Sequence, residues 1–244
     1  MAHETFPDAL AAALARTPGR PLVTFYDDAT GERVELSVTT YANWVAKTAG
    51  LLQDELFVER GSTVLIDLPT HWLGPVWLGA AWSVGAAVTD DGTVDGVDLV
   101  VCGPDTVAAH ASGEAPVVAL SLLPMGTAFR HPLPAGVVDY GRVVWGQPDA
   151  FFPDEPPEPD DVAWRDDSGA RTQRDLLAAV PGEGDEPRLL TDTNPSTAAG
   201  LETLLGPLLA GGGTVWVRHA DPDGWDRRAA AEQATRVLRD QPRS

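Results

Sequence analysis

The sequence has few of the residues that build disulfide-linked or metal-bound frameworks. Cys102 is the one cysteine among 244 residues, which excludes intramolecular disulfides and a cysteine-based zinc site. The five histidines do not follow the spacing of a metal-binding motif, so we expect no metal site. Lysine is equally scarce, since Lys47 is the one lysine among 17 basic residues. It lies opposite the apolar stripe of a predicted helix, and we expect its side chain to be solvated.

Basic charge and long apolar runs are also lacking. The formal net charge is −19, which argues against a broad basic surface for nucleic acid or an anionic membrane. There is no run of about 18 apolar residues, so we expect no membrane span. Near the start, Glu4 and Asp8 appear without a basic stretch before them, which is not typical of a signal peptide. We therefore expect a cytoplasmic protein without a nucleic-acid or membrane partner.

What the sequence does contain is an alternation of helical and strand patterns. Apolar residues three and four apart predict helices over 6–14, 41–52 and 196–209, and a last helix over about 223–240. A further helix, 72–84, is apolar on nearly every side, so we expect it to be buried on every side. Short apolar runs predict strands at 22–26, 34–36, 63–68, 86–88, 99–101, 117–120, 162–164, 188–191 and 214–217. This alternation predicts an α/β fold with a mainly parallel sheet, or sheets, flanked by helices.

Proline and acidic residues dominate residues 151–160. That composition is typical of an exposed loop. We expect this loop to join an N-terminal α/β subdomain, 1–150, to a second α/β portion, 160–244.

Four blocks of sequence follow one another in a specific order. They are "RPLVTFYDDATGERVELSVTTYANWVAKTAGLL", "GSTVLIDLPTHWLGPVWLGAAWSVGAAV", "LLTDTNPSTAAGLETLLGPLLAGGGTVWV" and "DPDGWDRRAAAEQATRV". Together they resemble the N-terminal part of the AMP-binding, adenylate-forming superfamily, whose members include acyl-CoA synthetases. The resemblance covers most of the chain except roughly 90–160. The segment "PLPAGVVDYGRV" also resembles a small bacterial family of short proteins that carry a degenerate domain of this kind.

The resemblance implies a phosphate-binding loop that the sequence does not contain. Such enzymes hold the ATP phosphates with a Ser/Thr/Gly-rich loop ending in Pro-Lys-Gly, in which backbone N–H groups, hydroxyls and a lysine supply donors and charge. Residues 165–174, "RDDSGARTQR", stand at that place. They have no lysine and no glycine-rich run, and Asp166 and Asp167 would repel a polyphosphate. A shortened turn is the favoured interpretation, and a remodelled phosphate site at Arg171 and Arg174 is the alternative.

Other residues that the superfamily uses are missing too. Ser196 and Thr197 stand where the resemblance implies an aromatic residue followed by histidine beside the acyl pocket. The catalytic lysine of the small C-terminal domain has no counterpart here. We therefore expect no cofactor and a protein that leans away from catalysis: a degenerate adenylate-forming domain that binds a protein partner, a second copy of itself or a small molecule.

A second hypothesis is that the protein is a small enzyme that retains a ligand-binding crevice. In α/β proteins, ligands bind where the carboxyl ends of parallel strands meet. The candidate residues for such a crevice each follow a predicted strand: His71, Asp90, Thr191, Asp192 and Asn194. An acyl group or a nucleotide would be its ligand, although His71 also fits a structural role at a helix start. One half of a split enzyme is a third, less favoured hypothesis, because that half should itself carry the phosphate loop.

Overall fold

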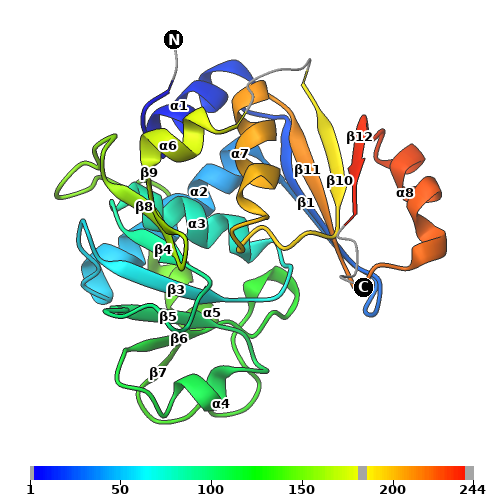
Figure 1. Ribbon diagram of the computed structural model, residues 1–244. Helices are drawn as coiled ribbons and strands as arrows, with labels where there is room; N and C mark the ends of the chain where they lie inside the picture. The colour runs from blue at the N-terminus through cyan, green and yellow to red at the C-terminus, as the bar shows by residue number, and fades with distance from the viewer. Residues whose placement is uncertain (1–2, 181–185, 240–244) are drawn as a thin grey trace.

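The computed structural model describes residues 3–180 and 186–239. Within these residues the strands form two sheets, one of five strands in the order β12-β10-β11-β1-β2 and one of seven in the order β7-β6-β5-β3-β4-β8-β9 (Figure 1). The first sheet contains β12 (Arg236–Leu238), β10 (Arg188–Thr191), β11 (Gly213–Arg218), β1 (Pro21–Asp27) and β2 (Glu32–Ser37). The second contains β7 (Val137–Asp139), β6 (Val117–Ala119), β5 (Leu99–Cys102), β3 (Thr63–Asp67), β4 (Ala87–Thr89), β8 (Val162–Asp166) and β9 (Gly169–Thr172).

Most strand pairs are parallel, and the antiparallel ones are the hairpins β1–β2 and β8–β9. The predicted α/β class with mainly parallel sheets is therefore confirmed. Both sheets draw strands from either side of residues 151–160, since β1 pairs with β11 and β4 pairs with β8. The division into subdomains 1–150 and 160–244 stays a prediction.

Helices α2 (Val38–Gly50), α3 (Leu73–Ser83) and α7 (Leu201–Ala210) lie between the two sheets (Figure 1). At one end of this layer lie α1 (Phe6–Arg16) and α6 (Gln173–Ala178), while α8 (Trp225–Ala231) covers the other face of the five-stranded sheet. The short helices α4 (Val107–His110) and α5 (Tyr140–Val143) lie beside the seven-stranded sheet.

Helix α3 is at the centre of the core. Every one of its residues is buried, as the sequence predicted, because α1, α2 and the seven-stranded sheet surround it. Trp77 and Trp82 are almost completely buried, and the Trp82 indole N–H donates to the Ala163 carbonyl at 2.9 Å. One continuous apolar cluster therefore joins both sheets through this helix.

The predicted last helix, 223–240, is confirmed over Trp225–Ala231 and is wrong over the described residues that follow. Helix α8 ends at Ala231, Gln233 adopts φ +53°, and the chain continues as β12, which pairs in parallel with β10. The exposed backbone edge of β10 takes a strand, and this pairing outweighs the helical pattern of the local sequence.

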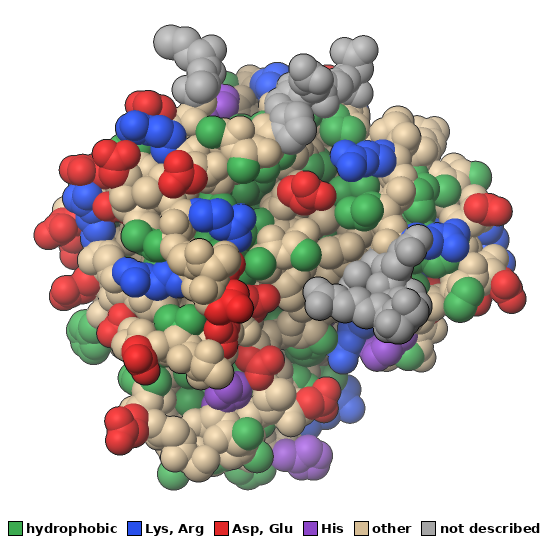
Figure 2. All heavy atoms as spheres, in the orientation of Figure 1, with side chains coloured by type: hydrophobic (Ala, Val, Ile, Leu, Met, Phe, Trp, Pro, Cys, Tyr) green, Lys and Arg blue, Asp and Glu red, His purple; other side chains and the backbone are tan. Residues whose placement is uncertain are grey.

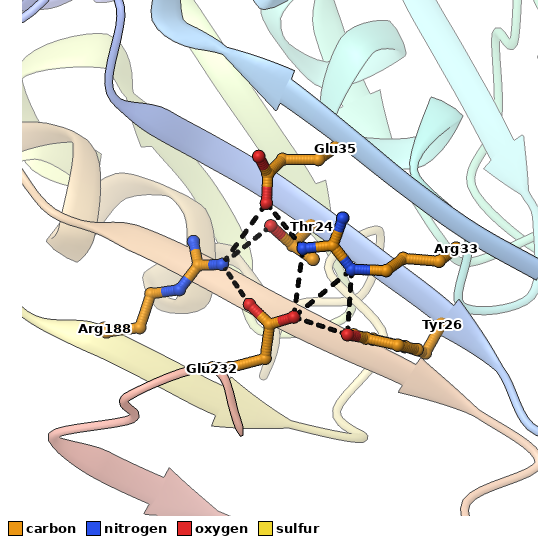
Figure 3. A network of polar contacts seen from close by, with 6 residues as sticks. All are labelled: Thr24, Tyr26, Arg33, Glu35, Arg188 and Glu232. Carbon is orange, nitrogen blue, oxygen red and sulfur yellow. Dashed lines mark hydrogen bonds and ion pairs between the residues drawn. The ribbon is translucent and has the colours of Figure 1, made fainter. Parts of the chain in front are cut away.

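The residue that follows α8, Glu232, forms contacts with residues that are distant in the sequence (Figure 3). Its carboxylate accepts hydrogen bonds from Tyr26, from Arg33 at 3.0 Å and from Arg188 at 2.5 Å. Arg188 also donates to Thr24 at 2.9 Å. The six residues drawn in Figure 3, here called the Glu232 network, connect the end of α8 to β1, β2 and β10: Thr24, Tyr26, Arg33, Glu35, Arg188 and Glu232.

Candidate functional site

Four of the five predicted crevice residues lie on the loops that follow β3, β4 and β10, which contact one another, and Thr191 is the last residue of β10. Asn194, after β10, donates from Nδ2 to the Leu68 carbonyl after β3 at 2.7 Å. Asp90, after β4, accepts from the Ala198 N–H at 3.3 Å, and Thr70 Oγ1 donates to the Asp192 carbonyl at 3.4 Å. Residues chosen because they follow parallel strands therefore lie on loops that meet where the two sheets adjoin.

Several of these polar groups hold the loops closed. Thr191 is fully buried, and its Oγ1 accepts from the Thr193 N–H at 3.0 Å. Asn194 Oδ1 accepts from the Ser196 N–H at 3.0 Å, so both ends of this amide are used within the protein. The predicted helix 196–209 accordingly begins only at Leu201, after the turn that Asn194 organises.

His71 is the most unusual group of the five. Its side chain is 1% exposed and lies edge-on to Phe25, with ring centroids 4.9 Å apart. Burial, aided by the positive charge of Arg218, lowers the pKa of His71 to about 3, so the ring is neutral. Its Nδ1 accepts from the Leu73 N–H at 3.2 Å, which leaves the ring proton on Nε2. Among the described residues, this buried Nε2 has no hydrogen-bond acceptor.

The two aspartates of the predicted crevice lie closer to solvent. Asp90 lies at the surface, and the loss of solvation on the side of its carboxyl that faces the protein raises its pKa. Asp192 is half-buried and directly follows β10.

Residues 165–174, where the sequence resemblance implies a phosphate loop, contain a tight hairpin between β8 and β9. Asp166 accepts from the Ser168 N–H at 2.9 Å, and hydrogen bonds from Ser168 hold the pKa of Asp166 below its ordinary value. Arg171 lies 3.7 Å from the same carboxylate and stacks over Trp164. Arg174 lies 3.6 Å from Glu4 and 3.5 Å from an Asp160 oxygen. Both arginines of the alternative phosphate site are therefore compensated by acidic neighbours.

The expectation that Lys47 is solvated is wrong. Its side chain is 19% exposed, its ammonium donates to the Gln147 carbonyl, and it lies 3.0 Å from Asp149. The segment that follows the 3₁₀-helix η3 (Val144–Gly146) packs across α2 at this point and covers the lysine.

The same packing creates a groove that the sequence did not predict. It has a volume of about 430 Å³ and lies between α1, α2 and residues 149–157. None of the five predicted crevice residues lines it. The available signal was the pair Phe151 and Phe152 in an otherwise polar, proline-rich segment, since two aromatic residues are unusual in an exposed loop.

No helix within 3–180 or 186–239 has the length and apolar character needed to cross a bilayer. The described part of the chain also holds no group of three or more His, Cys, Asp or Glu side chains arranged to bind a metal ion.

Solved structures of CoA ligases share this fold. An acyl-CoA synthetase from Brucella canis matches 95% of this chain with a TM-score of 0.79 at 18% identity, and the match covers 47% of that protein. A benzoate CoA ligase from Burkholderia xenovorans LB400 matches 96% with a TM-score of 0.73 at 15% identity, over 49% of its own length. A putative long-chain-fatty-acid CoA ligase from Rhodopseudomonas palustris CGA009 matches 98% with a TM-score of 0.74 at 21% identity, over 63% of its length.

The chain thus has the fold of the N-terminal domain of adenylate-forming ligases, and it spans about half the length of the first two ligases. No family model matches it. A protein of Mycobacterium tuberculosis (strain ATCC 25618 / H37Rv), described as a TIGR03089 family protein, is 40% identical over an alignment of 240 residues, and the match covers 92% of this chain and 94% of the relative. The chain belongs to the TIGR03089 family.

Proposed function

We propose that this protein is a non-catalytic, degenerate relative of the adenylate-forming ligases that acts as a binding or interaction domain. The observation that carries the proposal is the β8–β9 hairpin. The turn is short, because Asp166 at the end of β8 pairs directly with Gly169 at the start of β9. Within it, the Ser168 N–H donates a hydrogen bond to the Asp166 carboxylate. Such a turn has no row of free backbone N–H groups with which to surround phosphates.

The charge of the hairpin supports the same proposal. Asp166 and Asp167 stand at the turn, and Arg171 of β9 already faces Asp166 at 3.7 Å. A triphosphate approaching this turn would meet like charge without a lysine to offset it. Binding of ATP here would therefore be unfavourable.

Thermal unfolding tests the proposal. The protein is heated alone and with Mg-ATP, AMP or a non-hydrolysable acyl-adenylate analogue. A ligand at 100 times its dissociation constant stabilises by about 2.7 kcal/mol, which would raise the unfolding midpoint by roughly 5–10 °C at this size. We expect no shift with any of the three. A clear shift with the adenylate would contradict the proposal.

A second candidate function is binding of an acyl or nucleotide ligand at the ends of β3, β4 and β10. It is favoured by the buried Nε2 of His71 and by the buried Ser196 hydroxyl, neither of which has a hydrogen-bond partner among the described residues. A ligand oxygen would satisfy such groups. If this function holds, Asp192→Ala weakens binding of a ligand found by the thermal screen, and unchanged binding would remove Asp192 from the site.

A further inference from the structure

The groove between α1, α2 and residues 149–157 has the form of a binding site. Its walls are mainly apolar, with Leu10, Ala11 and Leu14 from α1 facing Phe151 and Pro153. Val45 and Ala46 of α2 lie along the same hollow. Its volume of about 430 Å³ lies within the ordinary range of ligand-binding pockets, roughly 300–1,000 Å³.

The apolar surface continues beyond the groove. Phe152 is 82% exposed, and it stands between groove residues Phe151 and Pro153. Immediately along the chain, Asp154 and Glu155 line a second hollow of about 350 Å³, which Phe57 also lines. Phe57 is 79% exposed, with φ +53°. Large exposed aromatic side chains beside a groove mark surfaces that bind other proteins.

The groove carries negative charge. Asp8 and Asp149 line it, and no basic side chain does. Lys47, outside the lining, offsets Asp149 at 3.0 Å, so the negative charge of the groove comes chiefly from Asp8. In the second hollow, Arg60 is already held by Asp161 at 2.8 Å and Glu158 at 2.9 Å. Acidic side chains are also spread over the face of the molecule drawn in Figure 2. Charge complementarity therefore favours a basic occupant and opposes a nucleotide or a fatty acid.

We propose that the groove binds an apolar, basic peptide segment of a partner protein. A small ligand would fill the hollow but leave Phe152 and Phe57 exposed, whereas a peptide covers both. A second copy of this chain, with a net charge of −19, would bring acid against acid. The inference rests on the proposed function, because it names the surface and the partner chemistry of a binding domain.

Two synthetic peptides of roughly 14 residues test the charge and apolar preference. One is an amphipathic sequence of leucine and lysine, and the other has glutamate in place of every lysine. Fluorescence anisotropy of the labelled peptides measures binding to the full chain. We expect the lysine peptide to bind and the glutamate peptide not to bind, and equal binding of the two would overturn the proposal.

Variants that fill the groove test the location. Ala11→Trp places an indole in the groove, whereas Ala15→Trp places one on an exposed position of the same helix that does not line it. We expect Ala11→Trp to weaken binding of the lysine peptide at least tenfold and Ala15→Trp to leave it within about twofold. Equal affinities for the two variants mean non-specific charge attraction and overturn the proposal. Ala46→Trp fills the groove from α2 and repeats the test should Ala11→Trp fail to fold.

Analytical ultracentrifugation tests the other possible occupant of the groove, a second copy of this chain. A wild-type dimer that Ala11→Trp converts to a monomer would show that a second copy fills the groove, and the peptide proposal would then be wrong. Stabilisation by the acyl-adenylate analogue would instead contradict the non-catalytic assignment and would leave the groove result unaffected.

Discussion

Two connections lead from a parallel strand to a helix, and they are stabilised in opposite ways. The connection from β8 to α6 is closed by its own neighbours, since Ser168 bonds Asp166 and Arg171 faces the same carboxylate. The connection from β10 to α7 is closed from far away, since Asn194 bonds Leu68, 126 positions distant, and Ala198 bonds Asp90, 108 positions distant. Residues in a turn that is stabilised by its neighbours can be replaced with little effect on the rest of the fold. The contacts of Asn194 and Ala198, in contrast, link a loop of one sheet to loops of the other.

The largest expected effect tests the distant connection. A Cβ at Gly200 would lie 1.8 Å from the Asn194 carbonyl oxygen, a backbone atom that cannot rotate away. We expect Gly200→Ala to lower the free energy of unfolding by about 3 kcal/mol, as measured by urea denaturation. Gly19→Ala is the control, because a Cβ there meets nothing within 4 Å. Equal unfolding midpoints for the two variants would mean that the connection is not rigid.

A second test uses the Glu232 network, which is also made of distant contacts. The Glu232 side chain is 8% exposed and faces Arg188 and Arg33. Glu232→Gln removes the buried carboxylate that these two arginines share and leaves them only the more exposed Glu35, at 2.7 Å from Arg33 and 3.9 Å from Arg188. We expect a loss of about 2 kcal/mol in urea denaturation. The exposed Glu114→Gln should change stability by less than about 0.5 kcal/mol. A similar loss in both variants would contradict a special role for the network.

The pH dependence of this loss sharpens the comparison. Burial opposes ionisation of Glu232, but hydrogen bonds from Tyr26, Arg188 and Arg33 outweigh it and lower the Glu232 pKa below its ordinary 4.5. A depressed pKa gives stability that is present above the unfolded value and is lost as the pH falls through the folded value. The difference in stability between wild type and Glu232→Gln should therefore be constant from pH 8 down to about 5 and shrink below about 4.5. A difference that grows on acidification would contradict the lowered pKa.

The smallest effect is expected in the locally closed hairpin. Arg171 has a side chain that is 39% exposed and one ion pair at 3.7 Å. Surface pairs of this kind contribute little, so Arg171→Ala should change the unfolding free energy by at most about 0.5 kcal/mol. A loss comparable to that of Gly200→Ala would show that the hairpin, too, is needed for the fold.

The buried parts of the fold were predictable from sequence, whereas three of the four edge strands of the described sheets, β7, β9 and β12, were not. The fourth edge strand, β2, was predicted. Helix α3 and strands β3 to β6 are short apolar runs, whose burial follows from composition. Strands β9 and β12 are largely exposed, and both were missed. Their strand conformation comes from pairing with β8 and β10 rather than from an apolar pattern.

The candidate site shows the same limit. The sequence could place Asn194 and Asp90 just after strands, because position after a strand is a local property. Their role in binding a ligand stays a prediction. The sequence could not show that the Asn194 amide forms hydrogen bonds within the protein that hold its loop in place. Nor could it show that the 149–157 segment packs against α1 and α2 to form a groove. Both depend on residues that are distant in sequence.

The pairing of β1 with β11 has a consequence for how the chain is made. Residues 21–27 pair with residues 213–218 at the centre of the five-stranded sheet. At a synthesis rate of roughly 5–20 residues per second, the apolar β1–β2 hairpin waits on the order of ten seconds or longer before its partner strand emerges from the ribosome. The middle of that sheet is consequently among the last parts to form, and β1 stays without its partner strand for that interval.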